Sequence, residues 1–144
     1  MSKISKEEKL LVWMLARASF LRVIAQIALD VAEKIHAHDE QYKLSHEYLN
    51  RNERITDYDW QIKVALEELE NLNPKLKSKV LKELMHDITV FRKYIFSNLL
   101  RNPFMCKIAV RGYFFKWQSY QGDAAPSPFS FTKAVSFGGR HRKL

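Results

Sequence analysis

The first proline or glycine of this 144-residue chain is Pro74. Either residue weakens a helix interior, glycine by about 1 kcal/mol and proline by about 3 kcal/mol relative to alanine. A run of seventy-three residues without them therefore predicts long helices. Hydrophobic residues make up 47% of the chain, which is enough to build a buried core. We expect an all-α fold, a bundle of about four helices.

A capping box opens the first predicted helix, because Ser5 is followed three residues later by Glu8. We expect this helix to run from about Lys6 to His36. Its apolar arc covers roughly 200°, much wider than the stripe of a surface helix. That width predicts a helix that is central in the bundle or shared with another subunit. The arc contains Leu10, Trp13, Met14, Phe20, Leu21, Ile24, Ala28, Val31 and Ile35.

The next stretch, residues 38–54, has a weak pattern. It fits an extension of the first helix or a short separate helix with a loop near Asn50 to Asn52. Thr56 is the expected cap of a helix that ends near Leu72, since threonine can accept a hydrogen bond from a free backbone amide.

Two Asn-Pro pairs predict the last two helix starts, with asparagine as the cap and proline in the first turn. The first pair predicts a helix from Pro74 to about Arg101, and the second a helix from Pro103 to about Tyr120. The alternation of apolar residues from Cys106 to Val110 leaves a strand as the competing interpretation there.

The chain is expected to divide into a helical domain, residues 1–121, and a linker with a basic tail, residues 122–144. Alternating side chains from Phe129 to Phe137 predict that the tail is extended, with a β-strand as one form of it. A single cysteine excludes an internal disulfide, which fits a reducing cytoplasm. No membrane span is expected, because charged residues interrupt the apolar stretch from Leu10 to Ala32.

Charge is distributed unevenly along the chain, whose net charge is +8. Residues 1–74 contain ten Lys/Arg and thirteen Asp/Glu, whereas residues 75–144 contain fourteen Lys/Arg and three Asp/Glu. The second part also holds twelve of the eighteen aromatic residues. This asymmetry indicates an anionic partner for one end of the molecule.

A basic stripe follows the first Asn-Pro pair, where four lysines and His86 fall within about 40° of one direction on the expected helix. Such a row can neutralise phosphates and gain affinity from counterion release, and nearby aromatic rings can stack on unpaired bases. The sequence therefore predicts a small non-enzymatic nucleic-acid-binding protein without a cofactor, and it does not distinguish DNA from RNA. The expected contacts are Lys75, Lys79, Lys82, Lys93, Arg101, Lys107, Arg111, Lys116, Trp117, Arg140, Arg142 and Lys143, with Tyr113, Phe115 and Tyr120 as further stacking rings.

An acidic protein surface satisfies the same charge pattern. The alternative function is therefore a helical protein-interaction module, such as an adaptor, an inhibitor or a homo-oligomeric structural subunit. The wide apolar arc of the first helix supports this alternative. Acidic and basic halves of neighbouring copies could also meet head to tail.

Two His-Asp pairs, His38-Asp39 and His86-Asp87, raise a third function that ranks well behind the others. They loosely resemble the His…His-Asp…Asp pattern of all-helical metal-dependent phosphohydrolases, in which a metal activates water. No metal ligand or catalytic residue is assigned on this pattern. A separate hypothesis pairs Arg17 with Asp87, because each lies within the apolar arc of its own helix and a buried charge needs a partner.

Overall fold

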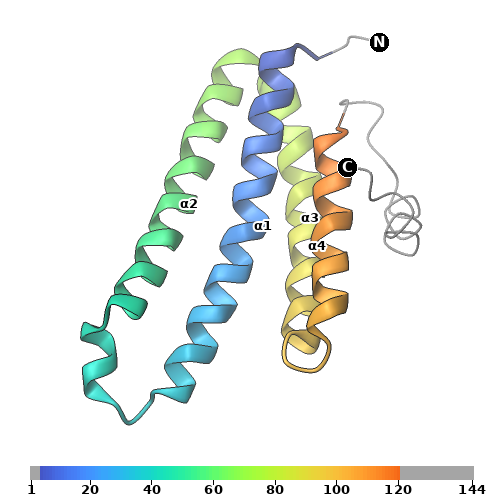
Figure 1. The fold of residues 1–144 in the computed structure, drawn as a ribbon. Coiled ribbons are helices and arrows are strands. Elements are labelled where there is room, and N and C mark those ends of the chain that lie inside the picture. Colours follow the sequence, from blue (N-terminus) through green and yellow to red (C-terminus); the bar gives the residue numbers. More distant parts are fainter. Residues whose placement is uncertain (1–3, 121–144) are drawn as a thin grey trace.

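The computed structural model describes residues 4–120, which form four long helices and one short 3-10 helix (Figure 1). The long helices are α1 (Lys6–Ile35), α2 (His46–Leu72), α3 (Pro74–Asn98) and α4 (Pro103–Gln118), and η1 (Glu40–Leu44) lies between α1 and α2. Successive helices run in opposite directions, so the α1–α2 and α3–α4 connections lie at the same end of the bundle. The all-α prediction is confirmed, since residues 4–120 contain no strand. The expected tail, residues 122–144, lies outside the described residues.

Polar caps begin three helices where the sequence predicts them. The Glu8 carboxylate accepts a hydrogen bond from the Ser5 amide at 2.8 Å, and the Ser5 hydroxyl accepts one from the Glu8 amide at 3.1 Å. The side chains of Asn73 and Asn102 accept bonds from the amides three residues later, at 3.1 and 3.3 Å. Each cap satisfies an amide that has no partner within its helix. The Ser5 amide and then the Asn73 side chain, which donates to Glu8 at 2.8 Å, lower the pKa of Glu8.

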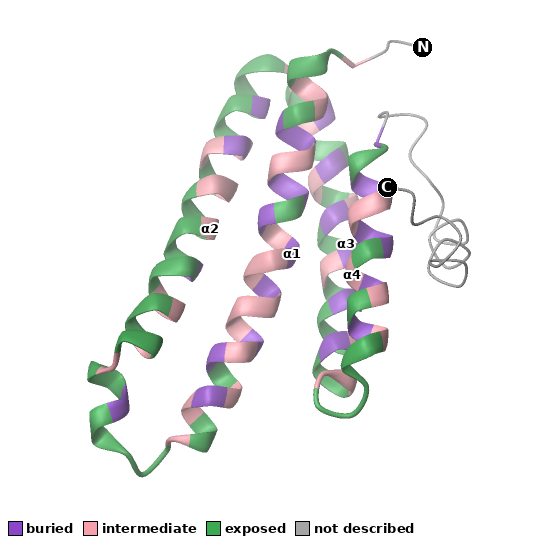
Figure 2. Cartoon of the chain, in the orientation of Figure 1, coloured by how far each residue is buried: buried purple, intermediate pink, exposed green. Residues whose placement is uncertain are grey.

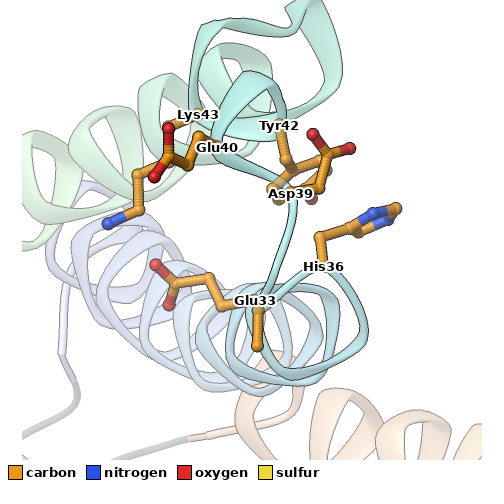
Figure 3. A pocket seen from close by; sticks show the side chains of 7 residues that line it. Glu33, His36, Asp39, Glu40, Tyr42 and Lys43 are labelled. Carbon is orange, nitrogen blue, oxygen red and sulfur yellow. The ribbon is translucent and has the colours of Figure 1, made fainter.

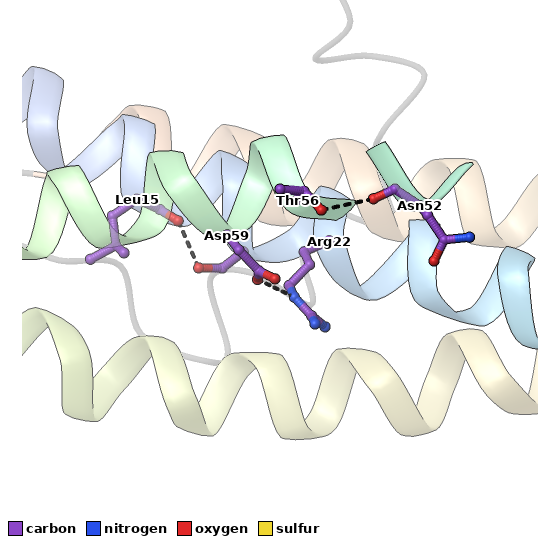
Figure 4. Close-up of polar contacts among 6 residues, drawn as sticks. Leu15, Arg22, Asn52, Thr56 and Asp59 are labelled. Atoms are coloured by element: carbon purple, nitrogen blue, oxygen red, sulfur yellow. Dashed lines mark hydrogen bonds and ion pairs between the residues drawn. The ribbon is translucent and has the colours of Figure 1, made fainter. Parts of the chain in front are cut away.

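The start of α2 differs from the prediction. Ser45 is the cap, and its hydroxyl accepts a hydrogen bond from the Tyr48 amide at 3.2 Å. Thr56, the predicted cap, lies inside α2 and donates its hydroxyl to the Asn52 carbonyl at 3.1 Å (Figure 4). The predicted loop near Asn50 is helical as well. The helix continues through this polar stretch because packing against α1 contributes more than local propensity.

Contacts with α1 hold α2 in place along its length. Arg22 of α1 forms an ion pair with Asp59 of α2 (Figure 4). Nearer the turn, the Tyr48 hydroxyl donates to the Glu33 carboxylate at 3.2 Å. The buried residues of α2 are Ile55, Ala65 and Leu69.

The strand interpretation of residues 106–110 is wrong, because α4 is a continuous helix through Gly112. Its buried residues recur with helical spacing, so the short alternation near Cys106 was a coincidence of the sequence. Burial raises the pKa of the Cys106 thiol, which makes this residue a small core group. The preceding helix, α3, ends at Asn98, slightly before the predicted Arg101.

The core gathers around α1, which contacts each of the other three long helices. The aromatic rings of Phe20, Phe91 and Tyr113, from α1, α3 and α4, form its centre. The centroid of Phe20 lies 5.0 Å from that of Phe91 and 4.9 Å from that of Tyr113. Phe91 and Tyr113 also meet edge to face at 5.3 Å. Three helices are thus fixed to one another by a single cluster of rings.

The buried side of α1 overlaps the predicted arc only in part, although the predicted central position of α1 is confirmed. Phe20 of that arc is fully buried, and Trp13, Met14, Ile24 and Val31 pack partly against the core. Leu10 and Ile35, both predicted on the buried arc, are 64% and 73% exposed. The helix is apolar almost all round, so periodicity alone selects no single inward side. Figure 2 shows α1 at the front of the bundle, with many half-buried residues on its visible side. The buried residues are Leu11, Val12, Leu15, Ala16, Ala18, Phe20, Val23, Ile27, Leu29 and Ala32.

By length and composition alone, α1 is also long and apolar enough to cross a membrane. A core helix of a soluble protein passes the same test. In the most apolar 18-residue stretch of α1, 44% of the residues are buried in the bundle. Most of the other residues in this part of α1 are half-buried.

Candidate nucleic-acid interface

The predicted basic stripe lies on the outer side of α3. Each of its five members is exposed, and α3 turns its apolar residues toward the core on the opposite side. The stripe contains Lys75, Lys79, Lys82, His86 and Lys93. The helical spacing that predicted this row therefore also predicts its exposure correctly.

The two acidic residues of α3, Glu83 and Asp87, both pair with Lys116 of α4. The Asp87 carboxylate accepts hydrogen bonds from the Lys116 ammonium at 2.7 Å and from the Trp117 indole N–H at 2.9 Å. Lys116 also forms an ion pair with Glu83 at 3.4 Å. Asp87 and Lys116 are only 5% and 3% exposed. One buried lysine of α4 thus pairs with both carboxylates of α3.

The outer surface of α3 and α4 is consequently strongly basic. Glu83 and Asp87 are the only acidic residues in the segment 74–120, and their side chains are 27% and 7% exposed. The same segment contains ten Lys/Arg. We call the exposed cations of this segment the α3–α4 basic surface. Its members are Lys75, Lys79, Lys82, Arg92, Lys93, Arg101, Lys107 and Arg111.

Helix α2 has the opposite character. Its seven acidic residues are all exposed, whereas it carries three Lys/Arg. The charge split of the sequence is therefore a split between parts of the bundle, with α2 acidic and the α3–α4 pair basic. The acidic residues of α2 are Glu47, Glu53, Asp57, Asp59, Glu67, Glu68 and Glu70.

Two of the predicted contact residues cannot reach a partner in this structure. Lys116 is buried with Asp87 and Glu83, and Trp117 is 1% exposed with its indole N–H bonded to Asp87. The predicted stacking rings Tyr113 and Tyr120 are buried as well. Lys116, Trp117 and Tyr113 contact α3, and Tyr120 stacks on Trp117 with ring centroids 5.2 Å apart. These four side chains are therefore not part of the exposed basic surface. Phe115 is half-buried. Arg140, Arg142 and Lys143 lie outside the described residues.

The hypothesis that Arg17 pairs with Asp87 is wrong. Arg17 is exposed on the outer side of α1, and Asp87 bonds to Lys116 and Trp117 inside the bundle. Within residues 4–120, no ion pair involves Arg17. Asp87 does need a buried partner, as predicted, but the partner comes from α4.

The sequence did not predict that two phenylalanines near the α3–α4 turn are exposed. Phe96 is 74% exposed and Phe104 is 68% exposed, and Leu100 between them is 83% exposed. Lys93 precedes Phe96 by one turn of α3, and Lys107 follows Phe104 by one turn of α4. Rings and cations therefore alternate around this end of the bundle. The sequence signal for a binding surface at this end was that residues 88–120 contain no Asp or Glu.

The structure does not bring the His-Asp pairs together. His38 and Asp39 lie in the connection between α1 and α2, whereas Asp87 is buried between α3 and α4. Across residues 4–120, no group of three or more His, Cys, Asp and Glu side chains is placed to hold a metal ion.

A hollow of about 400 Å³ beside this connection is lined in part by Glu33, His36, Asp39 and Tyr42. The His36 ring stacks on Tyr42 with centroids 4.0 Å apart. Figure 3 shows the Glu33 carboxylate and the His36 ring pointing to opposite sides of the hollow. These groups therefore do not converge on one ligand atom.

No family model, curated protein or solved structure matches this chain.

Proposed function

We propose that this protein binds single-stranded nucleic acid, without strong sequence preference, through the α3–α4 basic surface. The observation that carries the proposal is that the segment 74–120 has eight exposed Lys/Arg, whereas the side chains of its two acidic residues are only 27% and 7% exposed and both pair with Lys116. Such a surface offers little electrostatic repulsion to a phosphate backbone. Lysine and arginine in such a row release counterions when they neutralise phosphates, which supplies affinity that is independent of sequence.

The dimensions of the stripe fit a backbone ligand. From Lys75 to Lys93 the helix rises about 27 Å, which equals the length of about eight nucleotide steps in a B-form strand. The row can therefore contact several phosphates of one strand. Arg101 and Lys107 continue the positive charge around the α3–α4 turn.

The exposed rings favour an unpaired strand. Phe96 and Phe104 stand beside Lys93 and Lys107, and each ring is more than two-thirds exposed. Aromatic stacking on a base contributes about 1–3 kcal/mol, but only when the base is free of a duplex. A strand that follows the lysines of α3 meets these rings at the turn.

The test compares two quadruple variants with equal loss of charge. In the first, Lys75, Lys79, Lys82 and Lys93 are replaced by glutamine. In the control, the exposed lysines Lys6, Lys34, Lys43 and Lys63 of α1, η1 and α2 are replaced by glutamine. Fluorescence anisotropy with a labelled single-stranded oligonucleotide measures the dissociation constant of each protein.

We expect the first variant to bind at least about tenfold more weakly at low salt, and the control to bind nearly as the parent does. Equal losses in the two variants would show that only net charge matters and would contradict the proposed surface. Vesicles containing phosphatidylserine and a polyglutamate chain serve as competitors. Competition by either one as strong as that by unlabelled oligonucleotide would favour a membrane or an acidic protein as the partner.

A further inference from the structure

The outer side of α1 carries an apolar seam that the bundle covers only in part. Its residues are separated alternately by four and three positions over the whole helix, which is the heptad spacing of coiled coils. One of the eight residues, Arg17, is charged. The α1 seam consists of Leu10, Met14, Arg17, Leu21, Ile24, Ala28, Val31 and Ile35.

The α1 seam lies on the side of α1 between two flanks that contact other helices, and three of its members, Met14, Ile24 and Val31, also pack partly against the core. One flank of α1 contacts α2 through Arg22 and Asp59. The other flank contacts α4, where Trp13 meets Phe114 with ring centroids 5.5 Å apart. None of the eight seam residues is fully buried. Leu10, Arg17 and Ile35 are exposed, and the other five are half-buried between the two flanking helices.

We propose that the α1 seam is the interface of a two-fold dimer, in which α1 packs antiparallel against α1 of a second copy. In an antiparallel coiled coil, the two kinds of core position face each other across the interface. Pairing residues whose numbers add to 45 satisfies this rule for the whole α1 seam. Leu10 then faces Ile35, Met14 faces Val31, Arg17 faces Ala28 and Leu21 faces Ile24.

Size selects this register. The largest side chain of the seam, Arg17, lies opposite the smallest, Ala28, so the arginine has room to extend past the alanine. By the two-fold axis this match occurs twice. In a parallel dimer Ala28 faces Ala28, which leaves a gap, and close packing makes such gaps costly.

Charge selects the same register. A parallel dimer brings Arg17 directly against Arg17 of the second copy. In the antiparallel register the two arginines are eleven residues apart along the seam, or about 16 Å, which is about twice the Debye length in physiological salt. A single charged position in an apolar seam thereby specifies orientation, as polar core residues do in coiled coils.

The available area suffices for a stable dimer. From Leu10 to Ile35 the seam is about 38 Å long, and α1 with one flanking helix spans about 20 Å. The face therefore offers roughly 750 Å² per copy, close to the 800 Å² that one partner contributes to a standard interface. The basic stripe lies on the side of α3 opposite its buried residues, which belong to the core around α1, so a dimer presents two basic surfaces.

The first test measures the mass of the protein in solution and the oligomeric state of point variants. Multi-angle light scattering should give about twice the monomer mass of 17.0 kDa at high protein concentration. Leu21→Glu places two charges at the centre of the seam and should yield monomers. Leu49→Glu, at an exposed leucine of α2, is the matched control and should remain dimeric. Ala28→Glu places a carboxylate opposite Arg17, so it should strengthen the dimer in low salt.

Disulfide trapping tests whether the two α1 helices pair antiparallel or parallel. In a Cys106→Ala background, Leu10→Cys and Ile35→Cys chains should cross-link to each other when mixed, and neither should cross-link to itself. Self-cross-linking of the Leu10→Cys chain would establish a parallel pair and overturn the proposal. A monomeric mass at the highest soluble concentration would also overturn it, as would a monomer that inserts into vesicles through α1. None of these outcomes depends on nucleic-acid binding, so the dimer and the proposed function are tested separately.

Discussion

The carboxylate of Asp87 in α3 accepts a hydrogen bond from the Lys116 ammonium of α4 at 2.7 Å, inside the bundle. The pair joins the two basic helices, and it decides the character of the surface outside them. Lys116 also pairs with Glu83, so both carboxylates of α3 contact the same buried lysine. The internal packing of the bundle and its external charge thus depend on the same side chains.

Removing the buried carboxylate should strongly destabilise the fold. Asp87→Ala leaves the Lys116 ammonium with Glu83 alone and the Trp117 indole N–H without an acceptor. Breaking one side of a buried ion pair costs about 3–5 kcal/mol. The free energy of unfolding from urea titration should fall by that amount.

Two further variants distinguish the loss of the Asp87–Lys116 pair from the loss of any one carboxylate. Asp57→Ala, at an exposed carboxylate of α2, should change stability by less than about 0.5 kcal/mol. The double variant Asp87→Leu with Lys116→Met replaces the pair by apolar side chains and should recover most of the lost stability. A loss of under about 1 kcal/mol for Asp87→Ala would mean that the pair is not buried as described.

The second prediction concerns the ring cluster of the core. Phe20 is 0% exposed and contacts Phe91 and Tyr113 from two other helices. Phe20→Ala should therefore reduce the free energy of unfolding by about 3–5 kcal/mol. Phe96→Ala removes the same side chain from an exposed position and should leave the urea midpoint nearly unchanged. Similar losses for both variants would contradict the assignment of core and surface.

Tyr113 should make stability depend on alkaline pH. Burial and, secondarily, the charge of Asp87 raise the pKa of Tyr113 from 10.0 to about 12. The unfolded chain therefore loses this proton first as the pH rises. The stability that neutral Tyr113 contributes is complete below about pH 10 and is lost as the pH rises towards 12.

Tyr113→Phe retains the ring and removes the ionising group, so it isolates this effect. Between about pH 10 and 12, the urea midpoint of the variant should fall less than that of the parent. Parallel decreases in the two proteins would show that other groups, such as the lysines, account for the whole pH dependence.

The exposed rings at the α3–α4 turn should distinguish single strands from duplexes. Phe96→Ala and Phe104→Ala, combined, should weaken binding to a single-stranded oligonucleotide by about 1–3 kcal/mol for each stacked base. Binding to a duplex of the same length should hardly change, because its bases are not free to stack. Anisotropy titrations with both ligands measure the difference. Equal weakening for strand and duplex would argue against base stacking.

Local signals in the sequence were sufficient for much of the fold. The capping box at Ser5 and the asparagines at 73 and 102 satisfy free amides within their own helices, so no tertiary contact is needed to recognise them. The exposure of the lysine row on α3 followed from helical spacing alone. Both features depend on neighbours within one or two turns.

The errors arose where the outcome depends on another helix. Periodicity indicated that Asp87 lies on an inward arc, but it could not show whether Arg17 or Lys116 faces it. Lys116 was assigned to the surface by its charge, and only the packing of α4 against α3 shows that it is buried. The same limitation applies to α1, where two apolar sides compete and contacts with three helices choose between them.

A salt titration tests the central claim most directly. The logarithm of the binding constant for a single strand should fall linearly with the logarithm of salt concentration, with a slope of about −0.7 for each neutralised phosphate. Replacing Lys75, Lys79, Lys82 and Lys93 by glutamine should make that slope shallower by about 3, since four phosphate contacts are lost. An unchanged slope, or no binding by the parent protein at low salt, would contradict the assignment of the α3–α4 basic surface to nucleic acid.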